Sequence, residues 1–148
     1  MGKELKKCLD EWARRCGVSS ADADDDGVRF LVFDNKYEIR LSQIGRTVYL
    51  AADLGRLPEG RAAAGTVLDR LMALQLSCSQ GAAEVLALDD ESANLVLFRR
   101  LEAGDLDLSY FDLALSHFVN ELEFFKRQID QLRQPHVSPF SPPAVVHA

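Results

Sequence analysis

The feature that most restricts the fold of this chain is a long apolar periodicity near its C-terminal end. Large apolar residues recur at alternating spacings of four and three, namely Phe111, Leu115, Phe118, Leu122, Phe125, Ile129 and Leu132. Because an α-helix has about 3.6 residues per turn, this spacing places all of them on one helix face. The pattern predicts an amphipathic helix over 109–133, with Ser109 as its N-cap and Asp112 three residues later.

Another region shows the period of two that is typical of strands. After Asn35, the apolar residues Tyr37, Ile39 and Leu41 alternate with charged ones, which indicates a hairpin with one buried face. Other strands are indicated by short apolar runs between turn residues, and the run Leu95–Phe98 is apolar on both faces, as in a strand inside a sheet or at an interface. Strands are therefore predicted over 28–34, 37–41, 47–53, 84–88 and 93–99.

Two further helices complete the predicted order. The segment 3–16 carries one apolar stripe, formed by Leu5, Cys8, Leu9, Trp12, Ala13 and Cys16. The segment 61–76 is also predicted to be helical. The order helix, three strands, helix, two strands, helix predicts a single α+β domain over 1–133 with a mostly antiparallel, twisted sheet. Residues 134–148 hold four prolines and no periodicity, so they are predicted to be a disordered tail.

The helix predicted over 61–76 is apolar on more than one side. Its large apolar residues include Val67, Leu68, Leu71, Met72 and Leu74. A helix of this kind is covered on more than one side in the folded protein. In a small protein a second subunit is one way to supply that cover.

Composition excludes several classes of function. The chain has 148 residues, of which 47% are hydrophobic, so it can build one real core. Its formal net charge of −6 disfavours binding to nucleic acid or to anionic membranes, which needs clustered Lys and Arg. No apolar run approaches the roughly 20 residues that span a bilayer, and the first residues do not form a secretory signal. A cytosolic location is expected.

The motifs that could carry chemistry are incomplete. Segment 22–27 begins like a calcium-binding loop, with Asp22, Asp24 and Asp26 at alternate positions, but Phe33 stands where the bidentate Glu is expected. An acidic surface loop is the favoured interpretation. His117 has no partner at a zinc-ligand spacing, and no nucleophile–base arrangement is present. The sequence predicts a protein that is not an enzyme and has no cofactor; a calcium sensor or enzyme is the minor alternative.

Four strings carry a resemblance to a known family. They are Leu54-Gly55-Arg56-Leu57-Pro58, then Leu68-Asp69-Arg70-Leu71-Met72-Ala73-Leu74-Gln75, then Leu86-Ala87-Leu88-Asp89 followed by Leu95-Val96-Leu97, and finally Phe111, Leu115, Phe118 and Leu122. In this order the chain resembles the class I chaperones of bacterial type III secretion, the Tir-chaperone-like family, over about residues 3–133. It departs from them at Gln75, where the family usually has Asn.

The resemblance implies a homodimer that binds a secreted effector protein. The dimer interface would include Val67, Leu68, Leu71, Met72 and Leu74. The N-terminal region of the effector would bind in extended form, by pairing with a sheet edge and filling apolar grooves. The groove candidates are Leu5, Leu9, Trp12, Phe30, Val32, Ile39 and Leu41.

Two alternatives remain open on sequence alone. The stripe that contains Leu5, Leu9 and Trp12 either packs on the sheet or lines a groove for a partner segment. The chain itself is either a chaperone of the bacterial cytoplasm, with the export ATPase as a further partner, or a dimeric adaptor of a secretion system that binds a folded protein.

Overall fold

The fold confirms the predicted α+β class and the predicted order of elements. The computed structural model describes residues 3–17, 27–33, 35–78, 83–89 and 91–133. The elements are α1 (Lys3–Cys16), β1 (Arg29–Phe33), β2 (Tyr37–Ile44), β3 (Thr47–Arg56), α2 (Arg61–Cys78), β4 (Val85–Asp89), β5 (Asn94–Glu102), a 3-10 turn (Ala103–Asp105) and α3 (Leu108–Arg133). The boundary at residue 134 and the tail beyond it lie outside the described residues, so that part stays a prediction.

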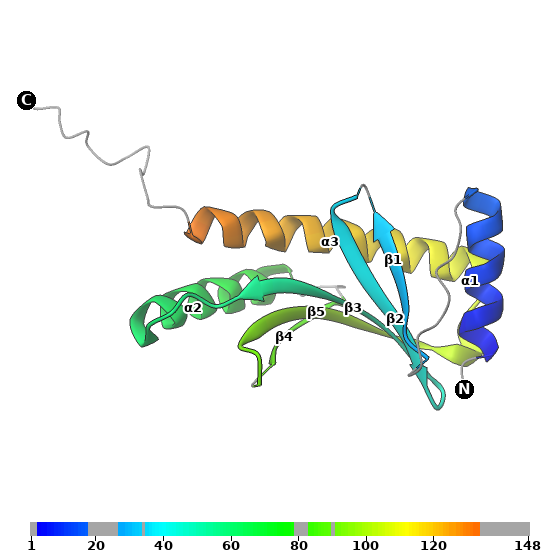
Figure 1. Ribbon diagram of the computed structural model, residues 1–148, viewed down its shortest axis with the longest axis horizontal. Helices are drawn as coiled ribbons and strands as arrows, with labels where there is room; N and C mark the ends of the chain where they lie inside the picture. Colours follow the sequence, from blue (N-terminus) through cyan, green and yellow to red (C-terminus); the bar gives the residue numbers. More distant parts are fainter. Residues whose placement is uncertain (1–2, 18–26, 34, 79–82, 90, 134–148) are drawn as a thin grey trace, which may run out of the picture.

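The five strands form one antiparallel sheet in the order β1-β2-β3-β5-β4. The α3 helix runs along one face of this twisted sheet, while α1 and α2 lie at its two ends (Figure 1). In this order, β1 and β4 are the two edge strands.

The core lies between the sheet and α3. Because side chains alternate between the two faces of a strand, β3 turns Val48, Leu50, Ala52 and Leu54 toward the helices. Their neighbours in the core are the predicted apolar residues of α3, and Phe111, Phe118 and Leu122 have no exposed surface. All three helices contribute buried residues to this inner side. We call the opposite side, which no described helix covers, the open face (Figure 1).

Three strands, β2, β3 and β5, are longer than the sequence pattern indicates. The third strand was predicted to end at residue 53, whereas β3 continues to Arg56. The pairing of β3 with β5 shifts register between Asp53 and Gly55, and Gly55 has φ of 106°. A glycine in this region of φ accommodates a bulge without steric cost. Gly55 is therefore a bulge within the strand and does not end it.

The N-terminus of α3 corrects a second prediction. The helix begins at Leu108, and the Asp107 carboxylate accepts a hydrogen bond from the backbone N–H of Tyr110 at 2.8 Å. This is the geometry of an N-cap side chain that satisfies a free donor of the first turn. The cap is Asp107, and the prediction of Ser109 was wrong, because the periodic pattern placed the N-cap two residues too late.

Truncation of a core residue of α3 should destabilise the chain strongly. Phe118 is fully buried, so Phe118→Ala removes a large apolar contact and leaves a cavity. We expect the free energy of unfolding, measured in urea, to fall by about 3–5 kcal/mol. Leu113 on the same helix is 70% exposed, so Leu113→Ala is the matched control and should change stability by less than about 0.5 kcal/mol. Equal losses for both variants would contradict this placement of the core.

Candidate functional site

The apolar stripe of α1 packs inside the chain. Leu5, Leu9 and Trp12 are 3%, 0% and 7% exposed. The Trp12 ring lies 6.0 Å from the rings of Phe33 and Phe111, and its indole N–H donates to the Asp112 carboxylate at 3.1 Å. These contacts attach α1 to β1 and α3. Of the two interpretations of the stripe, core packing describes these side chains.

The four strand residues predicted for the same site lie on two different faces. Ile39 and Leu41 point to the inner side and have no exposed surface. Side chains alternate along β1, and those of Phe30 and Val32 point away from the helices, to the open face. The Val32 side chain is 60% exposed there. The structure therefore does not bring the seven predicted residues together. Segment 28–34 is apolar on both faces, so its pattern does not show which side is buried.

A shallow groove lies where α1, β1 and α3 meet. It has a volume of about 230 Å³, with Trp12, Phe33, Leu115 and Val119 in its lining and Asp112 at its rim. It opens beside β1, an edge strand whose outer side has no partner among the described strands. A peptide could here combine main-chain pairing with an apolar contact.

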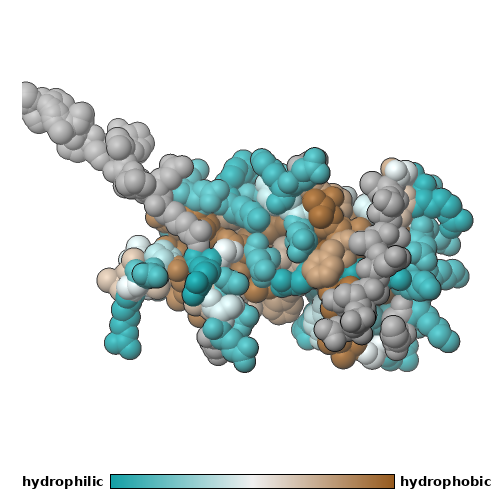
Figure 2. All heavy atoms as spheres, in the orientation of Figure 1, coloured by the Kyte–Doolittle hydropathy of each residue, from teal (hydrophilic) through white to brown (hydrophobic). Residues whose placement is uncertain are grey.

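The open face carries an apolar strip across the whole sheet. The strand register aligns one residue from each strand in a single row, Phe30, Arg40, Ala51, Phe98 and Val85. Within this row, Arg40 forms an ion pair with Asp53 at 3.0 Å. The strip runs from one sheet edge to the other and offers apolar side chains with a local pair of charges. Figure 2 shows hydrophobic residues that gather in patches along the molecule between hydrophilic ones.

The predicted dimer residues divide into core and surface. Val67 and Leu71 are 4% and 1% exposed and belong to the core, and Leu68 and Leu74 are partly buried against it. Met72 is 52% exposed. The inner side of α2 is thus covered within the chain, and the opposite side carries the residues that could contact a second subunit.

The structure adds residues to this surface that the sequence analysis missed. Seven large hydrophobic residues are exposed in the described chain, and four of them belong to α2 and β4. We call these four the edge surface: Met72, Leu76, Val85 and Leu88. The two elements lie at the same end of the molecule (Figure 1). The apolar character of Leu76 was visible in the sequence, but its place near β4 depends on the position of that strand at the sheet edge, where Val85 and Leu88 point to opposite faces.

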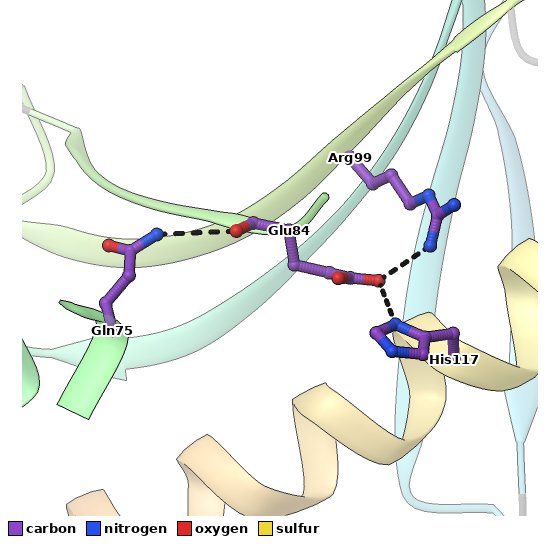
Figure 3. Close-up of polar contacts among 4 residues, drawn as sticks. All are labelled: Gln75, Glu84, Arg99 and His117. Carbon is purple, nitrogen blue, oxygen red and sulfur yellow. Dashed lines mark hydrogen bonds and ion pairs between the residues drawn. The ribbon is translucent and has the colours of Figure 1, made fainter. Parts of the chain in front are cut away.

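A buried carboxylate lies beside the edge surface. The Glu84 side chain is 1% exposed, and its Oε1 is 3.0 Å from Nη1 of Arg99 and 2.7 Å from Nδ1 of His117 (Figure 3). Burial raises the pKa of Glu84, but the hydrogen bonds from His117 and Arg99 outweigh burial, so its pKa lies below the ordinary value. The side-chain amide of Gln75 donates to the Glu84 carbonyl at 3.3 Å. Nothing in the sequence around Glu84 indicates its burial.

The structure offers no cluster suited to a metal ion within the ranges it describes. No group of three His, Cys, Asp or Glu side chains converges there. The aspartates of segment 22–26, considered above for calcium, lie outside the described residues. In the described part of the chain, no helix has the length and apolarity needed to cross a membrane.

The model of the Tir chaperone protein (CesT) family matches residues 7–126, and the chain belongs to this family. A comparison with curated protein sequences gives no match.

Solved structures share the fold. The chain is 23% identical to a chain of the ExsC–ExsE complex, with a TM-score of 0.67 and coverage of 86% of this chain and 94% of that one. It is 17% identical to a chain of the HopA1–SchA chaperone–effector complex, with a TM-score of 0.69 and coverage of 84% and 94%. It is 21% identical to a chain of the heterodimeric ExoU–SpcU complex from the type III secretion system of Pseudomonas aeruginosa, with a TM-score of 0.62 and coverage of 86% and 99%.

The two cysteines of α1 should differ in reactivity. Cys8 is buried and donates to the Asp107 carbonyl at 3.6 Å, and burial, with the nearby charges of Glu11 and Asp107, raises the pKa of its thiol to about 11. Cys16, in contrast, is exposed at the end of the helix. In a Cys78→Ser background, a thiol-specific chromogenic reagent at neutral pH should modify Cys16 at least about tenfold faster than Cys8, because the thiolate is the reactive form. Equal rates would contradict the packing of α1 on α3.

Proposed function

We propose that this chain is a non-enzymatic chaperone of the bacterial cytoplasm that binds the N-terminal region of a type III secreted effector. It would hold that region in extended form and keep the effector soluble and competent for secretion. The observation that carries the proposal is the one-sided cover of the sheet, which leaves an apolar strip and two sheet edges at the surface. Exposed apolar surface of this kind marks a binding site for another chain. Membership in a chaperone family and the shared fold with chaperone–effector complexes support it.

The effector segment would bind at β1 and the open face. A strand added to the outer edge of β1 alternates its side chains between the groove beside Trp12 and Phe33 and the open face around Phe30 and Val32. The buried residues of the predicted site, such as Leu9, would pack against the inner side of this surface and fix its position. The segment loses chain entropy and gains buried apolar area, and this coupling of ordering to binding needs no nucleotide.

A second copy of the chain would cover the edge surface. Met72, Leu76, Val85 and Leu88 supply the contact, and Val67 and Leu71 hold α2 in place from the core side. Homodimerisation of this kind explains why α2 is apolar on both sides. The export ATPase is a further proposed partner, and it rests on the family resemblance alone.

Purification of the tagged full-length chain from its native bacterium tests this function. We expect two copies of the chain with one copy of a larger secreted protein, as measured by light scattering. The N-terminal region of that protein should be sensitive to protease when free and protected in the complex. A folded partner domain with no protease-sensitive segment would instead support the adaptor alternative and contradict the chaperone.

Charged substitutions should separate the two surfaces. Val32→Glu should raise the Kd for the effector segment about tenfold or more and leave the dimer intact, because a buried carboxylate would face the bound strand. Met72→Glu combined with Leu76→Glu should yield a monomer in analytical ultracentrifugation. Leu113→Glu is the control, because Leu113 is equally exposed on α3 but belongs to neither surface. A control that disrupts binding as strongly as Val32→Glu would contradict the assignment.

A further inference from the structure

Glu84 joins four elements of the fold at one point. It directly precedes β4, its carboxylate contacts Arg99 of β5 and His117 of α3, and its carbonyl accepts the hydrogen bond from Gln75 of α2 (Figure 3). Glu84 is also the only residue of charged or polar type that is buried in the described chain. Its position therefore needs an explanation beyond solubility.

The strand that follows Glu84 is short and lies at the edge of the sheet. β4 has five residues and, within the described sheet, pairs only with β5. Val85 and Leu88 of this strand are about two-fifths exposed and belong to the edge surface. An edge strand of this length depends on side-chain contacts for a fixed position. The contacts of Glu84 with α3 and α2 supply them.

The charge balance around Glu84 requires its carboxylate to be ionised. Arg99 has a side chain only 15% exposed, and its charge is compensated by Glu84 at 3.0 Å. The other ionisable groups that face Glu84 are His117 and Glu121 of α3, and burial together with the Glu84 charge raises the pKa of Glu121. Gln75 of α2 is neutral, and residues 79–82 include no ionisable side chain. A neutral Glu84 would leave the Arg99 charge buried without compensation.

We propose that Glu84, Arg99 and His117 form an ionic anchor that positions β4 and the end of α2 for self-association, and that loss of the Glu84 charge releases this edge. This inference rests on the proposed homodimer and identifies what regulates its contact surface. The three residues are positioning residues, since they hold the edge surface in place without belonging to it.

The direction of the pH dependence follows from Glu84. Its pKa in the folded chain lies below the ordinary value of 4.5. The anchor therefore contributes fully above pH 4.5, and its contribution is lost as the pH falls through the lower pKa of the folded state. Self-association should weaken in acid, as the pH falls through the pKa of Glu84.

The test measures the dimer dissociation constant of the full-length chain by analytical ultracentrifugation. At neutral pH, Glu84→Gln should raise this constant by about tenfold, and the wild type should show a similar rise in acid. Asp53→Asn is the matched control, because Asp53 forms an equally short pair with Arg40 on the exposed open face. Its dissociation constant should equal that of the wild type. Fluorescence of Trp12, the one tryptophan of the chain, reports whether each variant is folded.

If Glu84→Gln does not fold, a second variant that lacks both charges of the Glu84–Arg99 pair tests the proposal. Glu84→Met combined with Arg99→Met removes both charges and fills similar volume, so the edge should stay in place. This double variant should dimerise like the wild type at neutral pH and lose the weakening in acid. An unchanged acid dependence in the double variant, or an unchanged dissociation constant in a folded Glu84→Gln, would overturn the proposal.

A second measurement tests the anchor even if the chain does not form a homodimer. If the wild type is a monomer at every concentration, the proposed self-association is wrong. The anchor is then tested by hydrogen exchange of the backbone amides of β4. Protection that falls about tenfold in Glu84→Gln but not in Asp53→Asn supports the anchor, and protection that is equal in both overturns it.

Discussion

The structure depends on one constraint: a single apolar face of α3 covers one side of a five-stranded sheet. The fully buried Phe111, Phe118 and Leu122 lie against the inner residues of β2, β3 and β5. The other two helices add to the same side, α1 through Trp12 and α2 through Leu71. None of the described helices remains to cover the open face. The apolar strip and the two edge strands are direct consequences of this arrangement.

The same constraint explains how the chain can expose apolar groups and still serve as a binding protein. Of the seven large hydrophobic residues that are exposed in the described ranges, four lie on the edge surface of α2 and β4, while Val32 lies on the open face. A chain with these surfaces risks aggregation, and the net charge of −6 opposes this by repulsion between copies. Val85 of β4 ends the apolar strip and also belongs to the edge surface, so the two proposed surfaces meet at this strand.

Much of the fold could be predicted because strong periodicity is a local signal. The predicted helix over 3–16 coincides with α1, and the pattern of α3 identified its buried face. The end of β3 could not be predicted in this way, since Gly55 reads as a breaker unless its partner strand is known. The same holds for segment 28–34, where apolar residues of both parities hide which of them face the core.

The site was predicted less well because it depends on contacts between distant segments. Ile39 and Leu41 were grouped with Phe30 and Val32 by proximity along the hairpin, and the pleat places the two pairs on opposite faces. Glu84 was missed because a carboxylate at the start of a strand is ordinarily exposed. Its burial becomes visible only when β5 and α3 bring Arg99 and His117 to it.

The most direct test of this account is hydrogen exchange measured by mass spectrometry on the free chain and on its complex with the client protein. The account predicts new protection in the backbone amides of β1, at the edge where the client strand pairs, and in the N-terminal region of the client. The exchange of the buried strand β3 should stay unchanged. A complex in which β1 exchanges as in the free chain, while a folded domain of the client becomes protected, would contradict the central claim.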